Sequence, residues 1–300
     1  LGAAYAILGG LRAVAVSDTY GGILVLAMGL LIVVLSLMAI DFDFSGIPAE
    51  RLTLIGDNAS PIPWPTLLTG MFLIQIFYWS TNQTITQRAM AAPTVKEAQK
   101  GVYAAAFIRV VFIPSMVVIP GIVAFKLYGD IGDEAYGRIV GDLLPGWLSG
   151  IFAAAIAAAV LSSFNSMVNS SASMYVCDLH EAYINDKPNL RLLSGVATAI
   201  FVIIAVSMVP IYAQSDSIIN LLQELWGLIS MPILACFAVG LLFRNVDYRA
   251  AIAAVIIGVL MYAGFIWLWM PLHYIHMMFF TFFTCVAMAL LINRFGLGKK

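Results

Sequence analysis

Residues 17–39 read SDTYGGILVLAMGLLIVVLSLMA and contain a single charged side chain, Asp18. An α-helix rises about 1.5 Å per residue, so about 20 apolar residues cross the roughly 30 Å hydrocarbon core of a bilayer. The whole chain resembles this stretch in composition: of 300 residues, 62% are hydrophobic and 10% are charged, and the mean hydropathy is +0.97. Soluble domains are about half apolar and a quarter charged, so this composition excludes an ordinary water-soluble protein.

Similar apolar stretches recur along the chain. They predict an all-α polytopic membrane protein with eight full spans, at 17–39, 64–81, 102–126, 146–176, 193–213, 218–243, 250–270 and 277–293. A further stretch, Leu1 to Gly10, is long enough for only about half of the hydrocarbon core, so we expect the sequence to be truncated at its N-terminal side. Because the loops are short, we predict one integral domain over residues 1–300, located in the plasma (inner) membrane as a multi-pass protein.

Lysine and arginine residues are unevenly distributed between the two predicted sides of the membrane. With alternating spans, eleven of the fifteen fall on one side and three on the other, while Arg109 lies inside a span. The positive-inside rule makes the first side cytoplasmic. The net charge of −1 favours no nucleic-acid partner.

Two segments on the predicted outer side are longer than the other loops, namely 40–63 and 127–145. Residues 133–144 (DEAYGRIVGDLL) carry apolar side chains at helical spacing, which predicts a short amphipathic helix over the bundle. Asn58, Ala59 and Ser60 form a glycosylation sequon in the first segment, although such triplets are common by chance.

Residues 64–93 change character midway. The apolar run ends at Trp79, and the polar string STNQTITQR follows at 80–88. One interpretation is a discontinuous helix unwound near the middle of the membrane, with Gln75 and Tyr78 at the break. The other is a normal span followed by a polar loop.

The span at 146–176 places small and polar residues on one helix face. These residues follow the i, i+3, i+4, i+7 spacing of one helix face: Ala159, Ser162, Ser163, Ser166, Ser170 and Ser173. Such a face can be a helix–helix interface, because small residues permit close approach. It can also be a site for a hard monovalent cation, since hydroxyl and carbonyl oxygens are the ligands that sodium-like ions prefer.

Three isolated ionisable residues lie in or beside apolar segments: Asp18, Arg109 and Glu224. A charge at membrane depth is costly and normally lines an aqueous pathway or pairs inside the bundle. For Arg109 we favour a bundle-facing role, whereas Asp18 and Glu224 are nearer helix ends, where interfacial capping is an equal alternative.

Several classes of function lack their motifs. The three cysteines and three histidines show no disulfide or metal-ligand spacing, and neither paired carboxylates nor a catalytic triad is present. We therefore predict neither an enzyme nor a protein with a bound cofactor.

Four strings together resemble the sodium/solute symporter family and, within it, the sodium/sugar cotransporter branch. They are GGLRAVAVSD (9–18), YWSTNQTITQR (78–88), AAAVLSSFNSMVNSSASMY (157–175) and QELWGLISMPILACFAVGLLF (223–243). The resemblance implies two inverted five-helix repeats whose first helices are broken around central sites. It makes residues 1–39 the end of the first repeat, 65–243 the second repeat and 250–293 additional C-terminal spans.

The resemblance also implies roles for individual residues. It makes Ala159, Ser162 and Ser163 the principal sodium site, with Asp18 and Ser166 at a candidate second sodium site, where Asn165 replaces a small hydroxyl residue. It gives four residues a role in solute binding, namely Gln75, Tyr78, Arg109 and Gln223. Tyr78 is the inner gate among them. Gln75 and Arg109 stand where sugar transporters carry Asn and Lys.

The expected partners are therefore a small solute, Na⁺ as the coupling ion and the lipid bilayer. A neutral sugar or polyol suits Gln75 and Gln223, because an amide both donates and accepts hydrogen bonds. A carboxylate that pairs with Arg109 is an alternative. A membrane sensor built on a transporter fold is a third.

Overall fold

The computed structural model describes residues 2–53, 55, 62–214 and 218–297. Within these ranges every regular element is helical. The sequon at Asn58 lies outside the described residues. The α-helices are α1 (Gly2–Ala39), α2 (Gly70–Ser80), α3 (Gln83–Met90), α4 (Val95–Tyr128), α5 (Ala135–Leu143), α6 (Gly146–Ser173), α7 (Glu181–Tyr183), α8 (Leu190–Tyr212), α9 (Ile218–Leu242), α10 (Tyr248–Trp267) and α11 (Tyr274–Leu291). Short 3₁₀ segments are η1 (Ala49–Arg51), η2 (Trp64–Leu68) and η3 (Gly132–Glu134), and π-helical turns are η4 (Met174–His180) and η5 (Ile292–Gly296).

Seven helical segments within the described ranges are long and apolar enough to cross a membrane. They correspond to seven of the eight predicted spans. The prediction for 64–81 is wrong as an uninterrupted span, because η2 ends at Leu68 and α2 contains only 11 residues. The stretch at 1–10 is not a separate element either, since α1 runs without interruption from Gly2 to Ala39.

The 64–93 segment is a discontinuous helix, as one of the two interpretations predicted. The helical path stops at Thr81 and Asn82, and both backbone N–H groups donate to the carbonyl of Phe77. Asn82 then begins α3, because its side-chain oxygen accepts from the backbone N–H of Thr84 at 2.9 Å. The predicted position of the break is wrong: Gln75 and Tyr78 lie inside α2, before the break.

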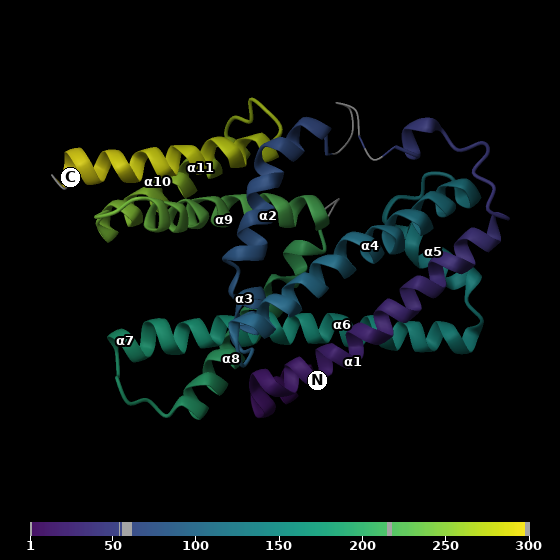
Figure 1. Cartoon of the computed structure of the whole chain (residues 1–300), viewed down its shortest axis with the longest axis horizontal. Coiled ribbons are helices and arrows are strands. Elements are labelled where there is room, and N and C mark those ends of the chain that lie inside the picture. The colour runs from purple at the N-terminus through teal and green to yellow at the C-terminus, as the bar shows by residue number, and fades with distance from the viewer. Residues whose placement is uncertain (1, 54, 56–61, 215–217, 298–300) are drawn as a thin grey trace. The chain divides into compact units, whose positions relative to one another are not determined.

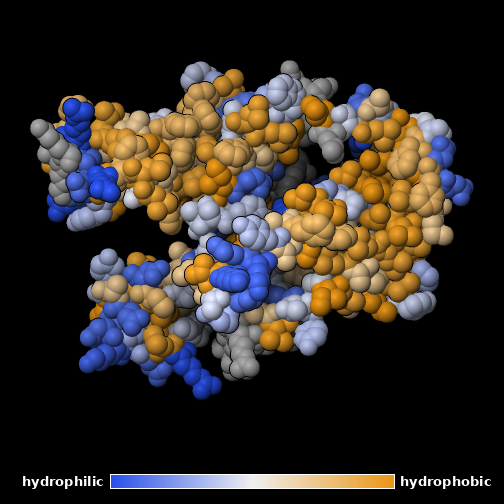
Figure 2. Space-filling view, in the orientation of Figure 1, coloured by the Kyte–Doolittle hydropathy of each residue, from blue (hydrophilic) through white to orange (hydrophobic). Residues whose placement is uncertain are grey.

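The chain divides into two compact units. Unit 1 consists of Leu1–Thr53 and Gln87–Ser207, and unit 2 of Leu54–Thr86 and Met208–Lys300. Large apolar side chains are exposed in each unit, for example Val110 and Leu241. Figure 2 shows hydrophobic residues over much of the visible face, with hydrophilic residues gathered around α7 and the C-terminal end of α11. Such surfaces suit helices that face lipid.

In unit 1, α1 packs against both α6 and α4, and it crosses α6 in Figure 1. At the C-terminal end of α1, α5 packs against α1 and α4 and covers their shared core. Ile139 of α5 is wholly buried, together with Ile32 and Val123. The predicted amphipathic helix at 133–144 is thereby confirmed, with its apolar face against α1 and α4.

In unit 2, α9, α10 and α11 pack together, and α2 lies against α9 and α11. The buried core includes Met231, Tyr262 and Met278. A Cβ atom at Gly70 would lie 1.8 Å from the carbonyl oxygen of Ile275. Only glycine therefore lets α2 approach α11 this closely, which is how small residues act at interfaces between membrane helices.

Candidate ion and solute sites

A charged and hydroxyl-bearing cluster forms in unit 1 where α1, α3 and α6 meet. Asp18 of α1 accepts a hydrogen bond from Ser162 of α6 through Oδ1, and its Oδ2 lies 2.5 Å from Nη2 of Arg88. The same Arg88 nitrogen also donates to Oγ of Ser166. Oγ of Ser166 lies 3.4 Å from Oδ2 of Asp18. One carboxylate, two hydroxyls and one guanidinium thus share a single partly buried site.

The sequence of α6 explains why this site forms. Ser162 and Ser166 lie four residues apart and so project from adjacent turns of one face. Both are buried, and Oγ of Ser166 also donates to the Ser162 carbonyl at 2.8 Å. Because these side chains are small, α1 can approach α6 closely and bring Asp18 to them.

The polar contacts continue along α6 past the ion pair. Gln87, next to Arg88 on α3, accepts a hydrogen bond from Ser170 at 3.0 Å and donates to Ser173 at 3.4 Å. The C-terminal part of α3 is therefore held to the serine face of α6 by two consecutive side chains.

Asn165 lies in the same stretch of α6 and is completely buried. Among the described residues, neither its amide oxygen nor its amide nitrogen has a hydrogen-bond partner. A buried polar group without a partner costs free energy, so a native structure that keeps one usually has a use for it, such as an ion or a water.

The principal sodium residues predicted from the resemblance do not share one environment. Ser162 is buried in the cluster with Asp18, whereas Ser163 is exposed and Ala159 is half-buried. The exposure of these neighbours differs because consecutive residues of an α-helix project about 100° apart, so that Ser162 and Ser163 lie at opposite edges of the same stripe. The structure instead joins Ser162 to Asp18 and Ser166, the residues of the candidate second site.

The predicted solute residues fall into both units. In unit 2, the Tyr78 ring lies 5.9 Å from the ring of Trp226 on α9, and 5.1 Å from that of Trp79. Gln75 accepts a hydrogen bond from the Trp79 indole at 3.1 Å.

Gln223 lies on α9, one turn before Trp226. The Tyr274 hydroxyl of α11 donates to its amide oxygen at 3.3 Å. Gln75 and Tyr78 are thus joined through Trp79, and Tyr78 lies beside Trp226, which follows Gln223 by one turn of α9. Arg109 belongs to unit 1, where it lies on the exposed face of α4.

Sequence reasoning missed the roles of Arg88, Gln87 and Tyr274. In the sequence, Arg88 is part of the polar string at 80–88 and has no predicted partner. A usable signal was present, because an isolated carboxylate such as Asp18 at the start of a span needs a partner. Tyr274 carried no comparable signal, since an aromatic residue at a helix start is common in membrane proteins.

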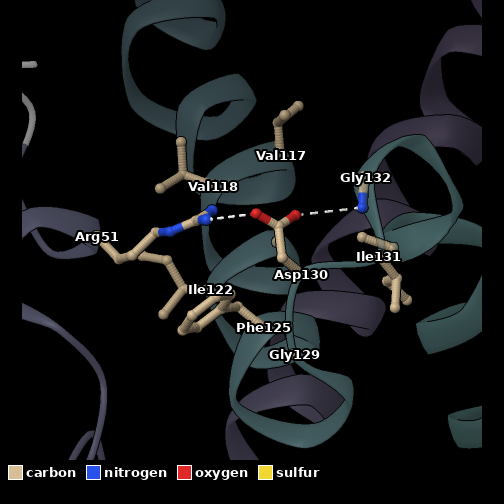
Figure 3. Close-up of a pocket in the computed structure, with 11 residues that line it drawn as sticks. Arg51, Val117, Val118, Ile122, Phe125, Gly129, Asp130, Ile131 and Gly132 are labelled. Atoms are coloured by element: carbon tan, nitrogen blue, oxygen red, sulfur yellow. Dashed lines mark hydrogen bonds and ion pairs between the residues drawn. The ribbon is translucent and has the colours of Figure 1, made fainter. Parts of the chain in front are cut away.

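A separate hollow of about 330 Å³ lies in unit 1 beside the end of α4 (Figure 3). Arg51 lies across it, with Nη2 at 2.8 Å from Asp130 and its guanidinium 4.3 Å from the centre of the Phe125 ring. The hydrogen bond from Arg51 and that from the Gly132 N–H lower the pKa of Asp130. The walls of the hollow are largely apolar, and none of the predicted site residues line it.

A second ion pair near this hollow joins Asp43, in the loop at residues 40–53, to Lys126 at the end of α4. Lys126 donates to the Asp43 carboxylate at 3.0 Å and also to its backbone carbonyl. Hydrogen bonds from the Ser45 hydroxyl, the Ser45 N–H and Lys126 lower the pKa of Asp43 to about 2. Residues 40–53 are therefore tied to the end of α4 by two ion pairs, which we call the loop anchor: Asp43–Lys126 and Arg51–Asp130.

Comparison with known proteins identifies the family to which these helices belong. The model of the sodium:solute symporter family matches residues 1–258. The chain belongs to the sodium:solute symporter family. Its members are transporters rather than enzymes, and the apolar helices agree with a multi-pass protein of the plasma membrane.

Individual relatives share from about a quarter to a third of the sequence. The uncharacterized symporter YidK of Escherichia coli (strain K12) is 31% identical over 97% of this chain and 54% of the relative. The sodium/glucose cotransporter of Vibrio parahaemolyticus is 34% identical over 74% of this chain and 45% of the relative. The sodium/myo-inositol cotransporter 2 of Sus scrofa is 27% identical over 67% of this chain and 33% of the relative. The chain thus spans about half the length, or less, of the curated relatives that it matches.

Proposed function

We propose that the parent protein carries a small polar solute, a sugar or polyol, together with sodium ions by alternating access. The observation that supports this most is the meeting of Asp18, Ser162 and Ser166 in one partly buried site at the junction of α1, α3 and α6. A carboxylate and two hydroxyls are oxygen ligands that suit a hard monovalent cation in a place largely shielded from water.

The principal sodium ion is proposed to bind at Ala159, Ser162 and Ser163, through the carbonyl of the first and the hydroxyls of the serines. Ser163 is exposed, which agrees with an ion that receives its remaining ligands from another helix. In the fold implied by the family, this helix is the first broken helix of the other repeat. Asp18 and Ser166 are proposed to form a second cation position.

The solute is proposed to lie against Gln75, Tyr78 and Gln223. Tyr78 and Trp226 supply aromatic faces, which suit the apolar face of a sugar ring. The two amides donate to and accept from its hydroxyl groups. The names of the glucose and myo-inositol cotransporters agree with this class of solute.

A carboxylate solute is a second candidate, favoured by the exposed position of Arg109 within a spanning helix of unit 1. A guanidinium can bind a carboxylate through two parallel hydrogen bonds. The charge of Arg109 makes the two classes of solute distinguishable, because a neutral sugar would not need it.

The experiment is uptake of radiolabelled sugars, inositol and small carboxylates by the full-length parent protein in proteoliposomes. We expect an inward sodium gradient, but not an equal potassium gradient, to accelerate uptake of a sugar or polyol. Unlabelled sugars should compete, whereas carboxylates should not. Sodium-independent uptake would contradict the coupling, and competition by carboxylates alone would contradict the assignment of the solute.

A further inference from the structure

We propose that the Arg88 guanidinium and a sodium ion compete for the same oxygen atoms of Asp18, Ser162 and Ser166. This proposal builds on the sodium-coupled function proposed above. It gives Arg88 the role of a tethered cation that occupies the second cation position when sodium is absent and is displaced when sodium binds.

The contacts of Arg88 carry the argument. Its Nη2 atom lies 2.5 Å from Asp18 Oδ2 and donates to Ser166 Oγ, so a single nitrogen bridges the carboxylate and one hydroxyl. These two oxygens are 3.4 Å apart, and the other carboxylate oxygen accepts from Ser162. The bridging nitrogen therefore stands where an ion bound by these oxygens would stand.

Charge makes the two occupants exclusive. Two positive charges a few ångströms apart repel strongly where water is scarce. Asp18 supplies one negative charge, which balances either the guanidinium or a sodium ion but not both. The side chains of Arg88 and Asp18 are 31% and 23% exposed, so solvent screens this repulsion only in part.

Asn165 adjoins Ser166 on α6 and carries an amide that none of these contacts uses. It is completely buried one position before Ser166, and its amide has no partner among the described residues. An amide oxygen is a suitable additional ligand for a hard cation.

The position of Arg88 connects ion binding to a helix. It lies in α3, the second half of the discontinuous helix, and beside Gln87, which holds the same end of α3 to Ser170 and Ser173. If Arg88 leaves its partners, then of these two neighbouring side chains only Gln87 still holds α3 to the serine face of α6. Sodium binding therefore weakens the attachment of α3 to α6.

The test is sodium binding to the purified full-length parent protein, measured by calorimetry without solute. We expect Arg88→Gln to bind sodium more tightly than the wild type, by roughly five- to a hundredfold, the usual range for coupled sites. In an Asp18→Asn background, Arg88→Gln should increase sodium affinity much less, because the carboxylate for which the two cations compete is gone. Arg88→Met removes the same charge without adding an amide and should behave like Arg88→Gln, which keeps the test valid if one variant does not fold.

Arg138→Gln is the matched control, since it removes an arginine that pairs with Asp142 in α5. Its sodium affinity should equal that of the wild type. Unchanged or weaker sodium binding in both Arg88 variants would overturn the proposal, as would tighter binding that persists at full size in the Asp18→Asn background. The function and the competition fail separately: sodium-independent uptake by the wild type contradicts the proposed symport, whereas the affinity difference tests Arg88 alone.

Discussion

Ser163 follows Ser162 directly on α6, yet only Ser162 belongs to the buried cluster with Asp18. The different surroundings of two neighbouring hydroxyls follow from the 100° step of the helix. At the scale of single residues, the two serines can therefore be assigned different tasks. Ser162 contributes to the site that the described helices form, and Ser163 offers its hydroxyl outward.

The first prediction concerns Ser163→Ala in the full-length parent protein. Loss of one hydroxyl ligand should raise the half-maximal sodium concentration for uptake, by roughly five- to a hundredfold for a cost of about 1–3 kcal/mol. Expression should be unchanged, because Ser163 is exposed. Ser171→Ala is the control, since that hydroxyl bonds the Met167 carbonyl of its own helix at 3.0 Å. An unchanged sodium requirement in Ser163→Ala would remove this residue from the sodium site.

The second prediction concerns Gln223→Ala. Tyr274 already bonds one lone pair of the Gln223 amide oxygen, so the residue has a structural contact as well as its proposed solute contact. Loss of the amide should weaken solute binding by about 1–3 kcal/mol and flatten the discrimination between a sugar and its deoxy analogues. Sodium binding measured without solute should change little.

Tyr274→Phe separates the two contacts of Gln223. It removes the hydroxyl that bonds the amide but leaves the amide in place. If Gln223 binds the solute, Gln223→Ala should alter the ranking of analogues far more than Tyr274→Phe does. Equal effects of the two substitutions, or an unchanged ranking in Gln223→Ala, would make Gln223 a purely structural residue.

At the scale of elements, the break between α2 and α3 depends on Asn82. Its side chain caps α3 through the Thr84 N–H. Asn82→Ala should destabilise α3 by about 0.5–2 kcal/mol, the usual cost of losing an N-cap. Hydrogen exchange of the amides at 84–90 should accelerate, whereas Asn82→Ser should keep the wild-type rates. Equal exchange in Asn82→Ala and the wild type would show that packing alone fixes the start of α3.

The loop anchor should respond to acid in a defined direction. The folded pKa values of Asp43 and Asp130 are both lowered, so their contribution to stability is complete above the unfolded value and disappears as pH falls through the folded value. Protection of residues 40–53 against hydrogen exchange, corrected for intrinsic rates, should therefore decline from about pH 4 toward pH 2.

A neutral-pH experiment tests the same anchor by substitution. Asp130→Asn should increase trypsin cleavage at Arg51, because it removes the carboxylate that holds this arginine. Asp133→Asn is the control, since Asp133 is an exposed acid on the neighbouring η3 and lies outside the anchor. Equal cleavage in the two variants would mean that the ion pair does not protect the loop.

At the scale of the whole molecule, the predicted topology follows from the distribution of Lys and Arg. Cysteines introduced at two loop positions test it, Lys187→Cys on the predicted cytoplasmic side and Asp133→Cys on the predicted outer side. In a parent protein without other cysteines, a membrane-impermeant maleimide applied to right-side-out vesicles should label only the second. Labelling of both or of Lys187→Cys alone would contradict the orientation.

The spanning helices and the amphipathic α5 were predictable from the sequence, and the discontinuity of 64–93 was one of the two interpretations that it allowed. They depend on the length, periodicity and polarity of a continuous stretch, and the thickness of the bilayer converts these directly into structure. The break lies a few residues after Gln75 and Tyr78, at Thr81 and Asn82, where the side-chain oxygen of Asn82 caps α3.

The sequence by itself thus determined that the chain crosses the membrane repeatedly, and its strings pointed to the symporter family, because both are recorded in local patterns. The tertiary structure decided which polar residues meet. Arg88 and Asp18 are 70 residues apart, and Tyr274 and Gln223 are 51 apart. Such contacts depend on how helices are rotated and packed against one another, and the pattern within any single helix does not contain that information.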